Sequence, residues 1–507
     1  MIVKEEWRYL YLNIHFSSYS NLFYIKRPIC QATDASDAIN ALLHNARFDK
    51  RWSRVMQRCG KWDLRMLMAV WGALLVAMVT MMSASSAWAA RKASIKQTPV
   101  HGVAQDVVLR HVLSGMSQDT LATLVLRFND EQKGRGRVIL QNAHDLDDTE
   151  RRNLPTMALL EPDDAPSFFQ GMPRFKPLYQ VMAVAKEKVD AKQFFPLIAD
   201  AVDDGAGRIQ ALPLGLSLPI LFWNKKSFQQ AGLNPDEAPK TWLDVQTRAG
   251  SLYDAGSQCP MTSSRFAWVH LENVSAQHGE PLAVAEKGGR SRIHLNSMVD
   301  VKHLALLSSW YKAHYFRYFG PRNEADRRFL SGECAMMTGE SSLYPEAVRA
   351  GLDVGVSQMP FYDDLYGANQ EKILPGGQGL WMLAGRKKEE YLTAARFAQF
   401  MMRPEIQSEW LRGTGFLPMT QGALNAMKAR GAPLPLVTLA TRRLAQASPA
   451  KTRAKYNLGL TRLREILGEE IATVWANLKP AKEALDTAMR RANSVPLTDE
   501  TMSVRAN

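Results

Sequence analysis

Apolar residues follow two different spacings along the chain from about residue 105 onward. Short apolar runs bounded by turn residues predict strands, whereas apolar residues at every third or fourth position predict helices. Strands are expected at 106–113, 137–141, 156–161, 333–339, 353–360 and 379–385, and helices at 117–132, 241–256, 299–315, 389–415, 461–478 and 480–493. This alternation of strands and helices predicts an α/β fold and argues against a helical bundle or a β-sandwich.

Several of the expected helices carry recognisable end signals. Ser117 and Thr241 are expected N-caps, and Asp244 can return the capping hydrogen bond to residue 241. Pro404 should divide the stretch 389–415 into two helices, and Gly415 should end the second of them.

One apolar stretch does not fit the strand pattern. Residues 213–228, PLGLSLPILFWNKKSF, run from a strand into a helix start, but Pro213, Gly215, Ser217 and Pro219 interrupt the apolar positions. Proline and glycine are disfavoured inside a central strand. The segment is therefore either an irregular edge strand or a place where the chain leaves one compact body and enters another.

The segment 66–89 has the pattern of an export signal. Lys61 and Arg65 precede an apolar run, which ends in small residues and the sequence Ala-Trp-Ala at 87–89. This pattern predicts a signal peptide at 66–89, cleaved after Ala89, and a mature protein in the periplasm. The alternative is an uncleaved membrane anchor. Because export signals normally begin near the first residue, we interpret residues 1–65 as a non-native or disordered extension.

Length, charge and cysteine content narrow the class of protein. A chain of 507 residues predicts two or three domains. The net charge is +13, but Lys and Arg are scattered singly and form no tract interleaved with aromatic residues, so we expect no nucleic-acid partner. Only Cys259 and Cys334 follow the predicted cleavage site, and they form either one disulfide or two buried thiols.

Motifs of catalysis and of metal or phosphate binding are missing from the sequence. The glycine-rich stretch 375–379 lacks the Gly-Lys-Ser/Thr ending of a P-loop, and there is no H-E-x-x-H or G-x-S-x-G motif. The acidic stretches at 144–150 and 161–164 lack the spacing of a calcium loop. We therefore expect no enzymatic activity, no metal and no cofactor.

From Leu214 to Trp475 the chain resembles the extracellular solute-binding proteins, family 1, of ABC importers. The matching stretches occur in the same order as in that family and lie at 219–233, 239–245, 268–281, 330–339, 374–383, 413–420 and 469–493. The resemblance implies a two-lobed, maltose-binding-protein-like fold with hinge crossings and a ligand cleft. It implies one lobe at 97–216 with 377–445, and the other at 217–376 with 446–507.

The same resemblance implies where the chain crosses between lobes and which residues contact the ligand. One crossing is expected within 214–220, which would explain the prolines and glycine there, and a second is expected near 374–377. The implied ligand-binding residues are Glu161, Ser217, Glu340, Ser341, Gly376, Gly377 and Phe416. Arg110 is added as a substitute cation, and Trp268 as a ring that stacks on ligand carbons, the alternative being a core tryptophan.

The chain departs from the family at several of these positions. Glu340 replaces a serine, with Ser341 beside it as a stand-in, and Phe416 replaces a tyrosine. The family's phosphate-binding arginine should lie near Tyr456 or Asn457, and neither can form charge-assisted hydrogen bonds to phosphate. Arg110 or Arg453 is the expected substitute.

These observations together predict a transport function. We expect a monomeric periplasmic protein that captures glycerol-3-phosphate, a glycerophosphodiester or a related polyol or sugar. It would deliver this small-molecule solute to the permease subunits of an ABC transporter in the inner membrane. The alternative is a diverged envelope interaction or sensor protein on the same fold.

Overall fold

The computed structural model describes residues 105–147, 153–160, 175–203, 206–285, 291–365, 368–369, 372–430, 435–444 and 460–494. The predicted extension and signal peptide lie outside the described residues, as do Glu161, Arg453, Tyr456 and Asn457. Within the described ranges, no helix is both long and apolar enough to cross a membrane.

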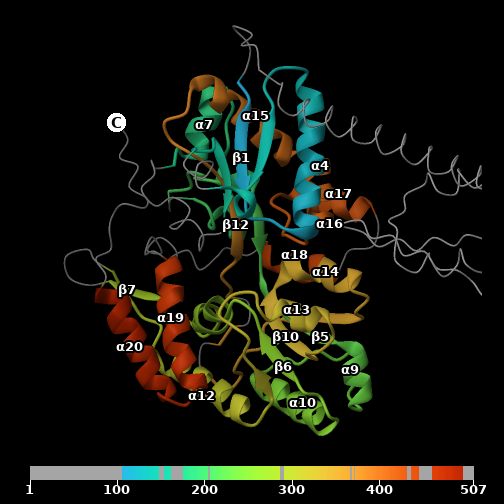
Figure 1. Ribbon diagram of the computed structural model, residues 1–507, viewed down its shortest axis with the longest axis vertical. Helices are drawn as coiled ribbons and strands as arrows, with labels where there is room; N and C mark the ends of the chain where they lie inside the picture. Colours follow the sequence, from blue (N-terminus) through green and yellow to red (C-terminus); the bar gives the residue numbers. More distant parts are fainter. Residues whose placement is uncertain are drawn as a thin grey trace, which may run out of the picture. The chain divides into compact units, whose positions relative to one another are not determined.

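A five-stranded mixed sheet organises the first half of the fold (Figure 1). Its strand order is β2-β1-β3-β12-β4, with β1 parallel to β2 and β3, and β12 antiparallel to β3 and β4. The strands are β1 (Val107–His111), β2 (Val138–Asn142), β3 (Met157–Leu160), β4 (Leu212–Ser217) and β12 (Gly376–Met382). We call this sheet and the helices that pack on it the first half.

Helices of the first half bury the apolar positions that the sequence pattern singled out. In the helix α4 (Gly115–Gln132), Leu121, Leu124, Val125 and Phe128 are all buried. The Phe128 ring lies 5.2 Å and 5.5 Å, between ring centroids, from two phenylalanine rings of α15 (Lys388–Met402). The other helices are α7 (Leu178–Val184), α8 (Pro196–Ala199), α16 (Pro404–Thr414), α17 (Gln421–Ala429) and α18 (Pro435–Leu444).

A second five-stranded sheet, of order β11-β5-β10-β6-β9, organises the second half. Its strands are β5 (Pro219–Asn224), β6 (Met261–Ser263), β9 (Phe316–Arg317), β10 (Met336–Glu340) and β11 (Val354–Gln358). The helices of this half include α9 (Lys225–Gln230), α10 (Trp242–Asp254), a π-helix (Ala267–Glu272), α11 (Asn273–Gln277), α12 (Met298–Lys312), α13 (Asp326–Leu330) and α14 (Tyr344–Arg349). A two-stranded sheet of β7 (Ala283–Ala285) and β8 (Ser291–Ile293) completes it, together with α19 (Leu460–Trp475) and α20 (Ala481–Ser494).

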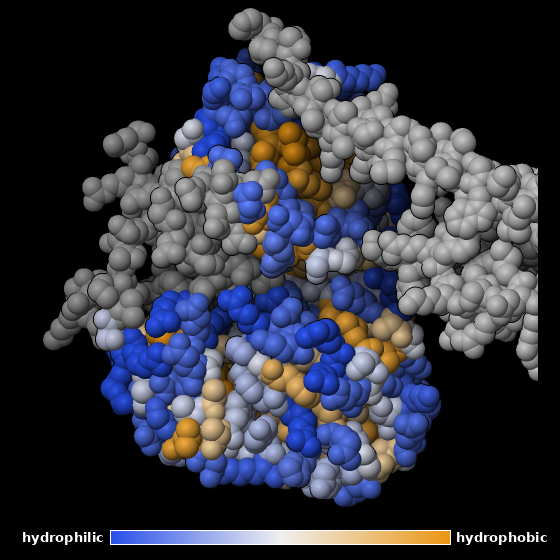
Figure 2. All heavy atoms as spheres, viewed as in Figure 1, coloured by the Kyte–Doolittle hydropathy of each residue, from blue (hydrophilic) through white to orange (hydrophobic). Residues whose placement is uncertain are grey.

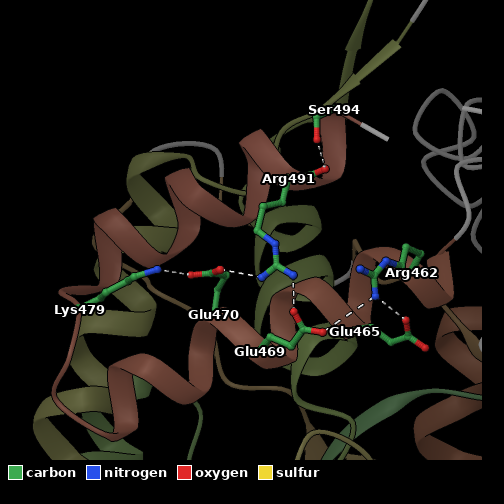
Figure 3. A network of polar contacts seen from close by, with 7 residues as sticks. All are labelled: Arg462, Glu465, Glu469, Glu470, Lys479, Arg491 and Ser494. Carbon is green, nitrogen blue, oxygen red and sulfur yellow. Dashed lines mark hydrogen bonds and ion pairs between the residues drawn. The ribbon is translucent and has the colours of Figure 1, made fainter. Parts of the chain in front are cut away.

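The helix pair α19 and α20 is joined by ion pairs (Figure 3). Glu470 lies 2.7 Å from Lys479 and 2.7 Å from Arg491, measured between carboxylate oxygens and side-chain nitrogens. Burial alone would raise the pKa of Glu470, but its hydrogen bonds to Lys479 and Arg491 lower that pKa below its ordinary value. On the face of the molecule seen in Figure 2, hydrophilic residues (blue) are interspersed with hydrophobic areas (orange).

The irregular segment 213–228 is the passage between the two sheets. β4 ends at Ser217, β5 begins at Pro219, and Leu218 alone separates the two strands. Pro213 is tolerated because β4 lies at the edge of its sheet, and Pro219 because it is the first residue of its strand. The predicted crossing at 214–220 is therefore confirmed, and the edge-strand interpretation also holds for its first part.

A second crossing enters the first sheet at β12. Gly376 and Gly377 pair with Ser217 and Leu216 of β4. Just before them, the backbone N–H of Leu374 donates to the side-chain oxygen of Asn273 in the second half, at 2.7 Å. The crossing that the resemblance implied near 374–377 is thus confirmed.

Some predicted boundaries are wrong by a few residues. The helix α4 begins at Gly115, with Ser114 at the N-cap, so Ser117 lies in its first turn. β12 begins at Gly376, three positions before the expected start, because backbone pairing with β4 holds the glycines in the sheet. The Thr241–Asp244 capping box and the helix end at Gly415 are confirmed.

The alternatives left open for the two cysteines are also resolved. Cys259 and Cys334 form a disulfide. They precede the neighbouring parallel strands β6 and β10, so the disulfide joins the beginnings of two paired strands.

Candidate functional site

The candidate site forms where the end of β10 meets the crossing between β4 and β5. The hydroxyl of Ser217 donates to Oε1 of Glu340 at 2.5 Å. The next residue, Ser341, accepts a hydrogen bond from the backbone N–H of Leu218 at 3.0 Å and donates its own N–H to the Leu218 carbonyl oxygen at 2.8 Å. Ser217 and Ser341 are fully buried. These bonds fix the two serines and Glu340 at the crossing.

Arg265 joins this group, although the sequence reasoning did not select it. Its Nε lies 2.9 Å from Oε2 of Glu340, and its backbone has a left-handed φ of 50°. The residue follows β6, and Glu340 ends β10, which runs parallel beside β6. Because parallel strands end at the same edge of a sheet, Arg265 and Glu340 meet there. We call Ser217, Arg265, Glu340 and Ser341 the crossing cluster.

Asp326 adds a second carboxyl group beside the crossing cluster. Burial raises its pKa to about 7; a hydrogen bond with Ser264 and the charge of Arg265 act in the opposite direction, and Glu340 adds to the rise. Its Oδ1 is buried and has no hydrogen-bond partner among the described residues. Two carboxyl groups, those of Glu340 and Asp326, therefore lie near the guanidinium of Arg265.

The two glycines of the second crossing are required by close backbone contacts. Gly377 has a φ of 107°, and a Cβ added there would lie 2.1 Å from the carbonyl oxygen of Gly215. At Gly376 an added Cβ would lie 2.8 Å from Cε2 of Trp268. Only glycine allows both approaches, which explains why the strand carries two of them.

Trp268 lies against this crossing. Its Nε1 donates to the carbonyl oxygen of Leu374 at 3.1 Å, and the residue is 3% exposed. The ring therefore packs on the backbone of the second crossing, and it meets Gly376 from the second half.

Phe416 contacts the crossing from the first half. Two carbons of its ring lie 3.4 Å from the position of a Cβ added at Gly215. The preceding residue, Gly415, approaches the second half so closely that an added Cβ would lie 2.6 Å from Pro345. The loop after α16 therefore touches both halves beside the crossing cluster.

The structure brings seven of the nine predicted residues to this region: Ser217, Trp268, Glu340, Ser341, Gly376, Gly377 and Phe416. Arg110 is buried on β1, where its side chain donates to Gln141 at 3.0 Å and to the carbonyl oxygen of Asn153 at 2.7 Å. These described partners belong to the first half. Glu161 lies outside the described residues.

A chain of buried polar side chains leads away from the crossing cluster. The hydroxyl of Thr338 on β10 is hydrogen-bonded to His270 at 2.9 Å. His270 is hydrogen-bonded to His303 at 2.8 Å, and His303 is hydrogen-bonded to the hydroxyl of Tyr362 at 2.8 Å. Burial lowers the pKa of His270 to about 3, so the ring is neutral at pH 7. Within the described ranges, no group of three His, Cys, Asp or Glu side chains is placed to hold a metal. The hydrogen bonds from Thr338 to Tyr362 therefore hold these buried side chains in fixed positions.

Comparison with known proteins identifies the family to which the chain is similar. The pattern of the bacterial extracellular solute-binding protein family matches residues 143–433, which span both crossings. The sn-glycerol-3-phosphate-binding periplasmic protein UgpB of Yersinia enterocolitica is 36% identical over 326 residues, which cover 63% of this chain and 74% of that protein. The UgpB of Salmonella typhimurium is 36% identical over 328 residues, covering 63% of this chain and 75% of that protein.

Solved structures agree at the level of the fold. UgpB from Mycobacterium tuberculosis in complex with glycerophosphocholine matches with a TM-score of 0.59 at 18% identity, covering 76% of this chain and 97% of that one. The maltose-bound MalE3 of T. maritima matches with a TM-score of 0.60 at 16% identity, covering 77% and 99%. The two-lobed periplasmic binding fold predicted from the sequence is confirmed.

Proposed function

The chain belongs to the family of bacterial extracellular solute-binding proteins, and we propose that it captures glycerol-3-phosphate, a glycerophosphodiester or a related polyol or sugar for an ABC importer. Family and relatives place it in the periplasm. Binding proteins of this kind deliver small-molecule solutes to permease subunits, and we extend this role to a monomer of this chain. The family is a transport component, and we propose that the chain has no enzymatic activity.

The observation that carries this proposal is the crossing cluster itself. Ser217 ends β4, the edge strand of the first half, whereas Glu340 and Ser341 belong to the second half, and hydrogen bonds unite them at the crossing. A solute that contacts this cluster together with the loop at Phe416 would touch both halves at once. Contacts made only in the closed state stabilise closure in proportion to the difference in binding energy between the two states.

The polar groups of the site suit a hydroxylated solute. Glu340 offers carboxylate oxygens and Arg265 offers guanidinium N–H donors, whereas the fully buried Ser217 and Ser341 hold Glu340 and the crossing backbone in place. The ring of Phe416 lies beside them as an apolar group on which the carbon face of a polyol or sugar can pack, and Trp268 supports the backbone of the second crossing. Nothing in the described geometry favours the alternative of a sensor without transport.

A thermal-shift panel followed by isothermal titration calorimetry tests the proposal. Protein purified from the periplasm would be mixed with glycerol-3-phosphate, glycerophosphoglycerol, glycerol, ribitol and maltose. We expect at least one phosphorylated or polyol solute to raise the melting temperature, because a ligand that binds only the folded state at 100 times its Kd adds about 2.7 kcal/mol. The absence of any shift across the whole panel would contradict the proposed function.

A further inference from the structure

The crossing cluster already holds an anion that belongs to the protein. The carboxylate of Glu340 receives a hydrogen bond from Ser217 on one oxygen and lies against the Arg265 guanidinium on the other. A guanidinium and a hydroxyl directed at one anionic group is the arrangement with which proteins bind a phosphate or a carboxylate of a ligand. Glu340 therefore occupies donors that an anionic solute would use.

We propose that Arg265 is the anion-binding residue of the solute site and that Glu340 competes with the solute for it, so that the site selects singly charged phosphodiesters over doubly charged phosphomonoesters. The inference rests on the proposed function and names the solute class more narrowly. It assigns to Arg265 the role for which the sequence offered Arg110 or Arg453.

The exposure of its glutamate distinguishes the Arg265–Glu340 ion pair from a purely structural ion pair. The side chains of Arg265 and Glu340 are 23% and 14% exposed, so a solute can reach them. In the pair between Arg464 and Glu272, two hydrogen bonds of 2.6 Å and 2.8 Å join the side chains. Arg464 is 19% exposed, much like Arg265, but the Glu272 side chain is only 2% exposed. The Arg464–Glu272 pair fastens α19 to the second half, whereas the Arg265–Glu340 pair lies at the crossing.

The charges around Arg265 explain the preference for a singly charged solute. A phosphate that binds Arg265 remains close to the Glu340 carboxylate after displacing it, and Asp326 adds further negative charge nearby. Both the attraction of a phosphate to Arg265 and its repulsion by carboxylates are proportional to its charge. At pH 8, above the pKa of Asp326 of about 7, the carboxylates of Glu340 and Asp326 outnumber the single guanidinium, so the net repulsion is about twice as large for a doubly charged phosphate as for a phosphodiester. Glycerol-3-phosphate carries up to two negative charges above its second pKa of about 6, and a glycerophosphodiester carries one.

Calorimetry at pH 8 with three probes tests the proposal: glycerol-3-phosphate, glycerophosphoglycerol and the neutral polyol ribitol. Wild type should bind the diester at least about tenfold more tightly than the monoester. Glu340→Gln should raise the affinity for the monoester by about tenfold to a hundredfold, raise that for the diester less, and leave ribitol unchanged. Arg265→Gln should weaken both phosphates by at least about tenfold, and in the double variant the gain from Glu340→Gln should disappear.

Two further variants make these outcomes decisive. Arg328→Gln removes a cation from an exposed ion pair with Glu333 in the same half and should change every affinity by less than about twofold. Glu340→Ser removes the carboxylate but keeps a hydroxyl, and should reproduce the gain even if Glu340→Gln does not fold. Melting curves of each variant confirm folding.

The possible failures are distinguishable. If Glu340→Gln weakens the phosphates and ribitol alike, Glu340 itself receives solute hydroxyls and the competition is disproved. If wild type binds a phosphate but the Arg265 and Glu340 variants bind it equally well, this inference fails while the proposed function stands. If neither wild type nor any variant binds any probe, the proposed function fails as well.

Discussion

The two halves of the fold share an architecture of one five-stranded sheet with helices, but they contribute differently to the candidate site. Within the described residues, the first half supplies shape: the close backbone contact of Gly215 with Gly377, and the ring of Phe416. The second half supplies charge, in Arg265, Glu340 and Asp326. Under the proposed function, the first half would fix where a solute can lie, and the second half would decide which charge it can carry.

The cores of the two halves also differ, because the core of the second half is the more polar of the two. Around Phe128 the first half is held by aromatic and aliphatic contacts. The second half buries the chain of hydrogen bonds from Thr338 to Tyr362 and is fastened by a disulfide. Buried polar groups are costly unless they are paired, so this core depends more on every partner being present.

The largest effect is expected from a substitution that disrupts the close backbone contact between Gly377 and Gly215. Gly377→Ala would force a Cβ to within 2.1 Å of the Gly215 carbonyl oxygen at a φ of 107°. We expect a loss of about 4 kcal/mol or more in the free energy of unfolding, measured by urea denaturation.

A matched glycine separates crowding from backbone strain. Gly385 has a φ of 75°, but an added Cβ would have no atom within 4 Å. Gly385→Ala should therefore cost only about 1 kcal/mol. Equal costs at the two positions would show that the contact between β4 and β12 is not what requires glycine.

An intermediate effect is expected from the disulfide of the second half. The double variant Cys259→Ala with Cys334→Ala opens a loop whose ends are 75 residues apart in sequence. Removing such a crosslink should lower the free energy of unfolding by about 3 kcal/mol. A reducing agent should lower the melting temperature of wild type and leave that of the double variant unchanged. If the reducing agent left the melting temperature of wild type unchanged, this expectation would be refuted.

The smallest effect concerns the acidic surroundings of Arg265. The pKa of Asp326 is about 7 in the folded protein, above its ordinary value of 3.8. Between these two pH values the unfolded chain has released the proton while the folded protein still holds it, so stability falls as pH rises through this window. Asp326→Asn should therefore match wild type near pH 4 and be the more stable of the two proteins at pH 8. A difference that is the same at both pH values would contradict the assignment.

Hydrophobic spacing predicted the α/β class and the long helices, whereas the two-lobed arrangement came from the family resemblance, and short strands such as β6 and β9 were not predicted. The buried face of α4 and the capping box at Thr241 follow from local sequence, because burial and capping leave a pattern within a few residues. The first residues of β12 could not be found in this way. Gly376 and Gly377 have no side chains to favour a strand, and they are strand residues only because β4 pairs with them.

The site was predicted in part for the same reason. Ser217, Glu340 and Ser341 came from a family resemblance, and the structure brings them together. Arg265 left no signal, because its partner lies far along the chain and only the parallel pairing of β6 with β10 brings them to one edge.

The most direct test of the account is the distance between the two halves with and without solute. Spin labels would be attached at Leu126 on α4 and Leu243 on α10, which are 66% and 71% exposed. Pulsed electron paramagnetic resonance would then measure the distance between the two labels in protein purified from the periplasm. We expect a glycerophosphodiester at saturating concentration to shift the distance distribution to a new, narrower peak, and we expect Arg265→Gln to abolish this shift at the same concentration. An unchanged distribution with a solute that calorimetry shows to be bound would contradict closure of the two halves as the mechanism.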